Sequence, residues 1–323
     1  MKSKVLLAAL FLIPCIAFGQ IMTPNVPIWD STHKFQIMLI TGQSQRSQHP
    51  ELTIGAPAEW TIVSGGGYTD WKEHGGAGSL LTASYPSSDL SSWTIKAKDH
   101  LKADPCIIKG WAIALRVGTW SRQQLLQYMK VVTATSGKAQ HPQVTAALPA
   151  GEYVLLGGGF AIAYSGKGNM LTDSWPQNNN FIVKSKDHVN SDPSTITSYA
   201  IGIRSTIPGV GRFVTSQVKA GPFKQDHYAQ GTASVASGYL LVGGGVETIN
   251  NDSNNYVSES ILKSLADVIT GDSPNRKTGK MIWMNYPTLS SSWEAGAKEH
   301  VLPEIYAQIR VYAVGLKVNP PPQ

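Results

Sequence analysis

The chain has 323 residues, a formal net charge of +6, only 15% charged residues and 31 glycines. Its lysines and arginines form no cluster, which argues against a nucleic-acid partner. After the N-terminus, no apolar run approaches the roughly 20 residues that a membrane span requires. Low charge with abundant glycine is typical of a compact, turn-rich β protein.

Residues 1–19 have the features of a secretory signal peptide. A basic start and an apolar stretch from Val5 to Phe18 precede the small-residue site Ala17-Phe18-Gly19. We therefore expect a secreted or periplasmic protein, cleaved near Gly19. Cleavage removes Cys15 and leaves Cys106 alone, so we expect Cys106 to be a small buried side chain and not half of an internal disulfide.

The rest of the chain repeats one pattern of residues three times. Each copy has a histidine, a Gly-Gly-Gly run, an aromatic-proline pair, an aromatic, a Lys-acid-His triplet and an apolar strand. The histidine lies sixteen residues before the first glycine in every copy. The copies comprise His49, Gly65–Gly67, Tyr85-Pro86, Trp93, Lys98–His100 and Trp111–Arg116; His141, Gly157–Gly159, Trp175-Pro176, Phe181, Lys186–His188 and Tyr199–Arg204; and His227, Gly243–Gly245, Tyr286-Pro287, Trp293, Lys298–His300 and Tyr312–Lys317.

The copies define three segments. Segment 1 covers residues 35–118, segment 2 residues 119–206 and segment 3 residues 207–318, with a lead at 20–34 and a tail at 319–323. The links between segments are short and lack the composition of a flexible tether, so we expect the segments to pack against one another. Segment 3 alone has an insertion, at about 246–282, in which residues 257–269 have a helical pattern.

Alternation with a period of two predicts strands throughout. In segment 1, Trp93, Ile95 and Ala97 share one face, and Lys96 and Lys98 share the other. Each glycine run follows a short apolar strand, where we expect it to supply a bulge or positive φ and to let main chains approach. We predict an all-β protein in which three homologous β-rich repeats pack with pseudo-threefold symmetry. Three tandem small β-sandwiches are the alternative.

The histidines before the glycine runs suggest one candidate metal site. If His49, His141 and His227 converge on a pseudo-threefold axis, three imidazoles would bind zinc and leave a fourth position open. A divalent metal is the one cofactor that the pattern suggests. In the alternative, each histidine bonds the backbone within its own segment. No local spacing such as His-x-x-x-His supports the metal.

The Lys-acid-His triplets are the second recurring polar group. A lysine and an imidazole at the end of a strand are candidates for binding a sugar, and the residues concerned are Lys98, His100, Lys186, His188, Lys298 and His300. The structural alternative is that the acids Asp99, Asp187 and Glu299 accept backbone N–H groups in a turn while the lysines stay in solvent.

Two tryptophans and one loop differ from this repeated pattern in their expected role. Trp71 and Trp175 are less constrained by the core pattern than Trp93, Trp111 and Trp293, so they are candidates for stacking on sugars. Glu73 and His74 follow Trp71 in a loop without counterpart in the other segments, which makes them the candidate catalytic pair.

Triplicate polar groups favour binding over catalysis, because equivalent weak sites gain avidity when the ligand also repeats. We expect a secreted, non-catalytic, lectin-like glycan-binding or adhesion protein with up to three equivalent sites. Its partner would be an extracellular or cell-surface glycan. The alternatives are a secreted polysaccharide-degrading enzyme, either a lyase or a glycoside hydrolase with one asymmetric site, and a structural surface protein. No Gly-x-Ser-x-Gly or His-Glu-x-x-His motif is present.

Overall fold

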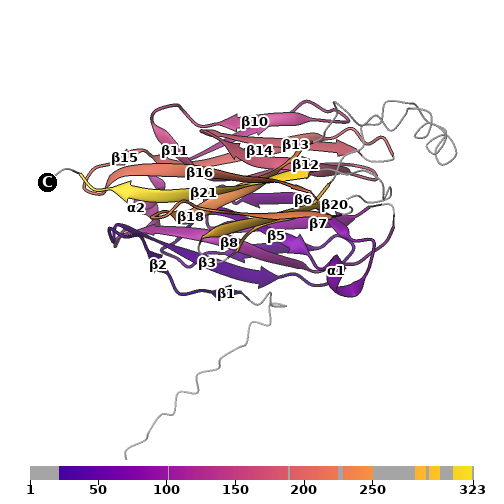
Figure 1. The fold of residues 1–323 in the computed structure, drawn as a ribbon, viewed down its shortest axis with the longest axis horizontal. Coiled ribbons are helices and arrows are strands. Elements are labelled where there is room, and N and C mark those ends of the chain that lie inside the picture. Colours follow the sequence, from indigo (N-terminus) through magenta and orange to yellow (C-terminus); the bar gives the residue numbers. More distant parts are fainter. Residues whose placement is uncertain are drawn as a thin grey trace, which may run out of the picture.

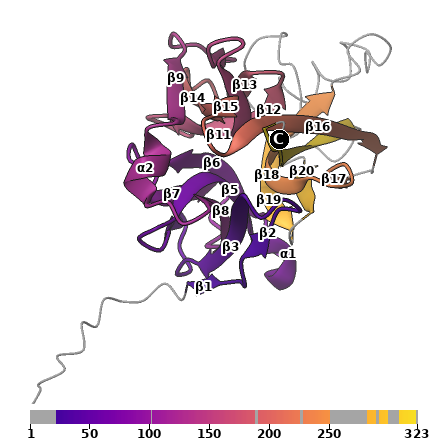
Figure 2. The same cartoon turned by 90° about the vertical axis from the view of Figure 1, so that its left-hand side faces the viewer.

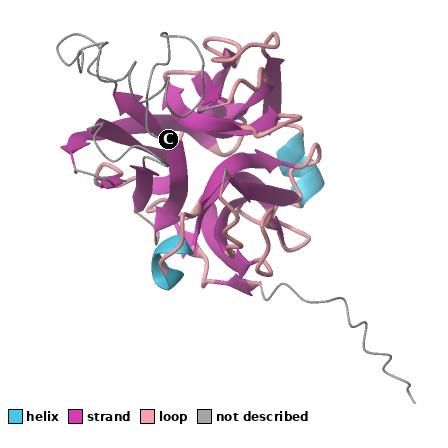
Figure 3. Ribbon diagram, turned by 90° about the vertical axis from the view of Figure 1, so that its right-hand side faces the viewer, coloured by secondary structure: helices cyan, strands magenta, loops and turns pink. Residues whose placement is uncertain are grey.

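The computed structural model describes residues 22–100, 102–187, 190–224, 228–249, 281–288, 291–298 and 308–321. This part of the chain is nearly all β, with three antiparallel sheets and two short helices (Figures 1 and 3). The prediction of an all-β protein is confirmed. The signal segment and the helical pattern at 257–269 lie outside the described residues.

Each segment contributes six main strands. Segment 1 has β3 (Phe35–Gln43), β4 (Glu51–Gly55), β5 (Thr61–Thr69), β6 (Ser79–Pro86), β7 (Ser92–Asp99) and β8 (Ile108–Val117). Segment 2 has β9 (Met129–Thr135), β10 (Gln143–Ala147), β11 (Tyr153–Ala163), β12 (Asn169–Gln177), β13 (Asn180–Asp187) and β14 (Thr195–Arg204). Segment 3 has β16 (Gly211–Lys224), β17 (Tyr228–Ser234), β18 (Leu240–Ile249), β19 (Met281–Thr288), β20 (Ser292–Lys298) and β21 (Gln308–Asn319). The short elements are β1 (Thr23–Pro24), β2 (Ile28–Trp29), β15 (Thr206–Ile207), α1 (Trp71–His74) and α2 (Arg122–Leu126).

Every sheet joins strands from two segments. Sheet 1 has the order β1-β3-β8-β5-β19-β20-β17, with β2 also paired to β3; sheet 2 has β4-β7-β6-β11-β14-β9; and sheet 3 has β10-β13-β12-β18-β21-β16-β15. In each sheet, the glycine strand of one segment pairs with the aromatic-proline strand of another: β5 with β19, β11 with β6, and β18 with β12. Each segment is therefore divided between two sheets, and seen end-on the three segments surround a common centre (Figure 2).

The predicted inward faces form the core. On β7, Trp93, Ile95 and Ala97 are buried in one large apolar cluster that includes all three segments. Trp93 and Trp293 also satisfy their indole N–H groups, as buried indoles usually do. Trp93 Nε1 donates to Ser84 Oγ at 2.8 Å, and Trp293 Nε1 donates to Asn285 Oδ1 at 2.6 Å.

The glycine runs lie where backbones and core rings leave no room for side chains. A Cβ at Gly65, Gly158 or Gly244 would lie 2.7 Å or less from the ring of Trp93, Phe181 or Trp293. A Cβ at the next glycine would meet the neighbouring backbone, at 1.9 Å from the Asn285 oxygen in the case of Gly66. A bulge precedes each run. The expectation of a bulge or positive φ, with close approach of main chains, is confirmed through the bulge, since none of these glycines has positive φ.

The glycine runs are not equivalent in register, although their spacing from the histidine is constant. The closing-strand aromatics Trp111, Tyr199 and Tyr312 pair with Gly66, Gly159 and Gly245. These are the second glycine of the first run but the third glycine of the other two. Ser64 is therefore structurally equivalent to Gly157 and Gly243. Alignment of the segments by the histidine-to-glycine spacing is wrong by one residue for the glycine run of segment 1.

Candidate functional site

The triplet lysines are buried, contrary to the expectation that they stay in solvent. Lys98, Lys186 and Lys298 are each less than a tenth exposed, and Lys298 is only 1% exposed. The alternation correctly places Lys98 on the face opposite Trp93, but a loop of the next segment covers that face at the strand end. Lys98 Nζ donates to the Lys167 carbonyl and lies 5.1 Å from the centre of the Tyr164 ring.

Lys298 makes the same kind of contact from segment 3 to segment 1. Its Nζ donates to the Ala77 carbonyl and lies 4.0 Å from the centre of the Trp71 ring. Burial lowers the pKa of Lys98, and it lowers that of Lys298 to about 7. These two contacts, which we call the lysine latches, join the end of one segment's strand to the post-glycine loop of the next.

Of the triplet histidines, only His100 falls within the described residues; His188 and His300 lie outside them. His100 is buried, and its Nδ1 lies 3.1 Å from the same Lys167 carbonyl that accepts from Lys98. His100 therefore lies in the latch of Lys98, and the described lysines and histidine of the triplets are buried away from the surface.

The triplet acids behave as the structural alternative predicted. Asp99 accepts the backbone N–H of Asp104 at 3.2 Å, and Asp187 accepts that of Asp192 at 3.1 Å. Glu299 lies outside the described residues. In segments 1 and 2, therefore, the acid of the triplet closes a turn.

Two further aspartates hold the latch loops, and the sequence analysis missed them. Asp104 accepts the backbone N–H of Gly78, while Asp192 accepts those of Gly166 at 3.0 Å and Gly168 at 2.6 Å. Each lies five residues after its triplet acid and is followed by proline. That repeated spacing was the available signal.

The first histidines lie beside the triplet acid of their own segment. His49 Nε2 is 3.7 Å from Asp99 Oδ1, and His141 Nε2 is 3.3 Å from Asp187 Oδ1. His227 is outside the described residues. Across the described ranges, no group of three or more His, Cys, Asp or Glu side chains is arranged to hold a metal. The side chains of His49 and His141 each lie beside a carboxylate, and not beside the backbone group that the structural alternative predicted.

The two candidate stacking tryptophans are more constrained than expected. Trp71 and Trp175 are each only 6% exposed, and Lys184 Nζ lies 4.9 Å from the centre of the Trp175 ring. In the candidate catalytic pair, Glu73 forms an ion pair with Lys109 at 2.6 Å, while the side chain of His74 is outside the description. Cys106 is buried as predicted, and burial raises the pKa of its thiol.

We call the three pairings of a glycine strand with the aromatic-proline strand of another segment the seams: β5 with β19, β11 with β6, and β18 with β12. Aromatic side chains of the repeat form rows across these seams. In sheet 1, Tyr286 on β19 and Trp111 on β8 both lie beside Gly66, which has no side chain to separate them. Their rings stack with centres 4.4 Å apart and an interplanar angle of 23°. In sheet 2, Tyr85 and Tyr199 stack in the same way at 5.7 Å.

Sheet 1 extends its row into a longer series of rings, which we call the aromatic band. Consecutive ring centres are 4.4 to 6.4 Å apart along Trp111, Tyr286, Tyr68, Trp283, Trp71 and Tyr228. The band crosses from β8 to β17, four strand spacings or about 19 Å. The first three rings, Trp111, Tyr286 and Tyr68, are half-buried, Trp283 and Trp71 are buried, and Tyr228 is 39% exposed.

Polar side chains border the band. Lys109 Nζ lies 5.7 Å from the centre of the Tyr68 ring and is paired with Glu73. The Tyr286 hydroxyl donates to Glu294 at 2.6 Å, and burial together with this bond raises the Tyr286 pKa. Sequence reasoning assigned Trp111 to the core. The recurring aromatics on either side of a glycine strand were a signal that could have revealed the rows.

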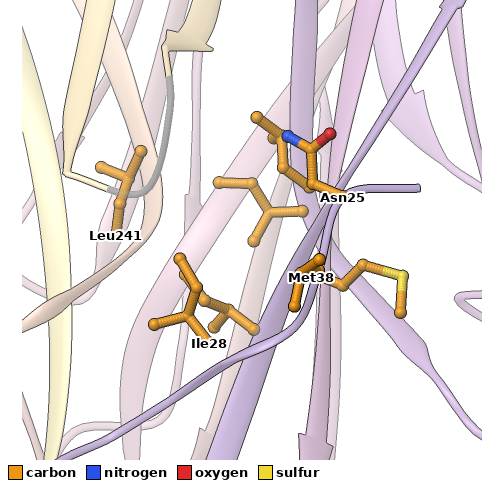
Figure 4. A pocket seen from close by; sticks show the side chains of 8 residues that line it. Asn25, Ile28, Met38 and Leu241 are labelled. Atoms are coloured by element: carbon orange, nitrogen blue, oxygen red, sulfur yellow. The ribbon is translucent and has the colours of Figure 1, made fainter. Parts of the chain in front are cut away.

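Two depressions lie elsewhere on the molecule. A cavity of about 230 Å³ opens between the N-terminal lead and β18, and its lining is apolar apart from Asn25 (Figure 4). A second, open depression is lined by amides, but these hold each other: Gln217 bonds the backbone of Asn178 in both directions, at 3.0 and 2.6 Å. Neither combines aromatic faces with available polar groups as the aromatic band does.

Comparison of the chain with protein-family models gave no match, and a search of curated protein sequences found no significant match. Neither helix in the described part of the chain has the length and apolar character needed to cross a membrane. The functional argument therefore rests on the geometry of the chain itself.

Proposed function

We propose that this protein binds glycans without cleaving them, and that the aromatic band on sheet 1 is its main binding surface. The band itself supports this proposal. Ligand sites usually combine aromatic and apolar surfaces with a few placed polar groups. The half-buried rings of Tyr68, Trp111 and Tyr286 offer apolar surface to a sugar ring, and Glu73 and Lys109 offer partners to its hydroxyl groups.

The proposal includes the threefold arrangement of the segments. All three sheets have the same order of strand types, and each sheet contains one seam between a glycine strand and an aromatic-proline strand. In sheets 1 and 2 the seam places two stacked aromatics beside one glycine, and in sheet 3 Trp175 and Tyr312 both lie beside Gly245. We infer one extended site on sheet 1 and two smaller sites on sheets 2 and 3, which would add avidity toward a repeating ligand.

Export belongs to the same proposal. The secretory features of residues 1–19 would deliver the protein to the extracellular or periplasmic space, where polysaccharides and cell-surface glycans are found. In the one loop with a candidate catalytic acid, the Glu73 carboxylate receives two contacts from Lys109, at 2.6 and 2.9 Å. This pairing suits a fixed polar contact better than proton transfer.

The test is a glycan array followed by titration of the best ligand. We expect Trp111→Ala to weaken binding at least tenfold, or about 1.4 kcal/mol. Trp120→Ala is the matched control, because Trp120 is also half-buried and contacts one tyrosine, Tyr128 at 5.2 Å, but lies outside the band. Near-ultraviolet circular dichroism confirms that both variants are folded.

Two results would contradict this function. Equal affinities for Trp111→Ala and Trp120→Ala would remove the band as the binding surface. Release of reducing ends or unsaturated products from a polysaccharide would identify the protein as a degrading enzyme.

A further inference from the structure

We propose that the band selects an acidic glycan, whose carboxylate or sulfate group is bound by Lys72 at the Tyr228 end. This inference rests on the proposed glycan-binding function and specifies the class of ligand.

Lys72 extends from α1 over three rings of the band. Its Nζ lies 4.9 Å from the centre of the Trp283 ring, 5.0 Å from Tyr228 and 5.8 Å from Trp71. The ammonium donates one hydrogen bond, to Gln230 Oε1 at 3.1 Å. Both Lys72 and Tyr228 are exposed, so a ligand can reach this end of the band.

Lys72 differs in its charge balance from Lys109, the half-buried lysine at the other end of the band. Lys109 is neutralised by Glu73 at 2.6 Å. Lys72 makes no ion pair with any carboxylate in the described ranges; the nearest influence is Glu294, which already accepts the Tyr286 hydroxyl. A ligand anion would supply the negative charge beside Lys72 that the described residues do not provide.

A second ammonium strengthens the positive potential at this end. Lys298 Nζ lies 4.0 Å from the centre of the Trp71 ring, the same ring that Lys72 approaches. The charge on Lys72 helps to lower the Lys298 pKa, and burial lowers the pKa of both. An anion bound here would relieve the repulsion between the two ammonium groups.

The hydrogen-bond inventory also favours an acceptor-rich ligand. The indole N–H groups of Trp71 and Trp283 are buried and have no acceptor among the described residues. The cluster thus holds two lysine side chains and two buried N–H groups, and Gln230 is the one acceptor that Lys72 contacts among the described residues. Carboxylate and sulfate oxygens accept hydrogen bonds and cannot donate them when ionised.

A cationic ligand fits this cluster less well. Three aromatic rings around an ammonium resemble the cages that bind quaternary amines. Here, however, the protein's own Lys72 occupies that position, and Lys298 would repel a second cation. The charge therefore favours an anion beside Lys72 over a cation in its place.

The test compares three hexasaccharides by titration at low salt: an oligogalacturonate, a heparin fragment and neutral maltohexaose. We expect at least one acidic ligand to bind tenfold or more tightly than the neutral one, with the preference falling at 0.5 M salt. The carboxylated and sulfated arms identify the group recognised. Lys72→Gln should remove the preference, whereas Lys130→Gln, at an exposed position of β9 in sheet 2, should change affinity less than twofold.

The outcomes separate this inference from the function on which it rests. Equal binding of acidic and neutral ligands, with no effect of Lys72→Gln, overturns the acidic specificity and leaves glycan binding intact. An array on which no glycan of any kind binds overturns both.

Discussion

The two lysine latches occupy equivalent places but have different surroundings. Lys98 contacts Tyr164 and the Lys167 carbonyl, with Asp99 and Asp192 raising its pKa against burial. Lys298 contacts Trp71 and the Ala77 carbonyl. Asp104 and Cys106 oppose the lowering of its pKa, while the neighbouring Lys72 adds to it. Lys167 lowers the pKa of Lys98 as Lys72 lowers that of Lys298, so both latches combine burial, two groups that raise the lysine pKa and one lysine that lowers it. The loops that the two lysines contact differ more, because the loop of segment 1 includes α1.

That loop explains why sheet 1 has the longest series of rings. The loop of segment 2 reaches Gly166 and Gly168 soon after β11, whereas segment 1 inserts α1, which contributes Trp71, Lys72 and Glu73. These three residues complete the aromatic band and its polar border. The proposed binding surface therefore lies where segment 1 has side chains that segment 2 lacks at the equivalent latch.

The largest expected effect comes from changing the charge in the Lys298 latch. Its folded-state pKa of about 7 lies below its ordinary value of 10.5, so ionisation of Lys298 opposes folding below pH 7. Stability should therefore rise from about pH 7 to 10.5, where the unfolded chain binds more protons. At about 1.4 kcal/mol per pKa unit, the full effect is roughly 5 kcal/mol. Lys298→Met should lack this pH-dependent gain in urea unfolding.

Lys98→Met is the matched control for that measurement. The two carboxylates that face Lys98 partly compensate its burial, so its contribution should have the same sign and a smaller size. Identical unfolding profiles for wild type and Lys298→Met between pH 7 and 10.5 would contradict the assignment. So would a larger pH-dependent effect at Lys98 than at Lys298.

The next effect tests the seam that the latches flank. A Cβ at Gly66 would lie 1.9 Å from the Asn285 carbonyl oxygen, so Gly66→Ala must separate β5 from β19. We expect a loss of about 3 kcal/mol or more in the free energy of unfolding, at the upper end of overpacking. Thermal or urea unfolding measures it.

Gly55→Ala provides the control, because a Cβ there would contact nothing within 4 Å. It should change stability by less than about 0.5 kcal/mol. Equal stabilities of the two alanine variants would show that the seam tolerates separation, and the aromatic row over Gly66 would lose its explanation.

The sequence predicted the strands better than it predicted their environment. Period-two alternation placed Trp93 inward and Lys98 on the opposite face, and both placements are correct. Alternation within one strand cannot show that a loop of another segment covers Lys98. The same limit applies to Trp71, which is buried against Trp283, Tyr228 and Lys298, all distant from it in sequence.

Register was the other property that spacing could not provide. The sixteen-residue interval aligned the three glycine runs, yet Gly66 and Gly159 are equivalent in the structure. Bulges set the local register, and their position depends on contacts between segments. The aromatic band escaped prediction for the same reason, since its six rings belong to segments 1 and 3 and meet only across a seam.

The third seam extends the comparison to a buried carboxylate. Asp173 occupies the bulge position that Ala83 and Met284 hold in the other segments, and it accepts the Thr248 backbone N–H at 2.8 Å. Burial raises its pKa to about 6 from an ordinary 3.8. Because the folded-state pKa is raised, this group contributes stability at low pH that is lost as the pH rises from about 4 to 6.

Asp173→Asn should remove that loss, because an amide oxygen still accepts the Thr248 N–H and carries no charge. Relative to wild type, the variant should gain up to about 3 kcal/mol between pH 4 and 6.5 and be little different below pH 4. Ser185→Ala, at a buried position on the paired strand β13 without a titrating group, should show no such pH dependence. A constant difference between Asp173→Asn and wild type across this range would mean that the carboxylate stays ionised in its seam, with the nearby Lys184 outweighing burial.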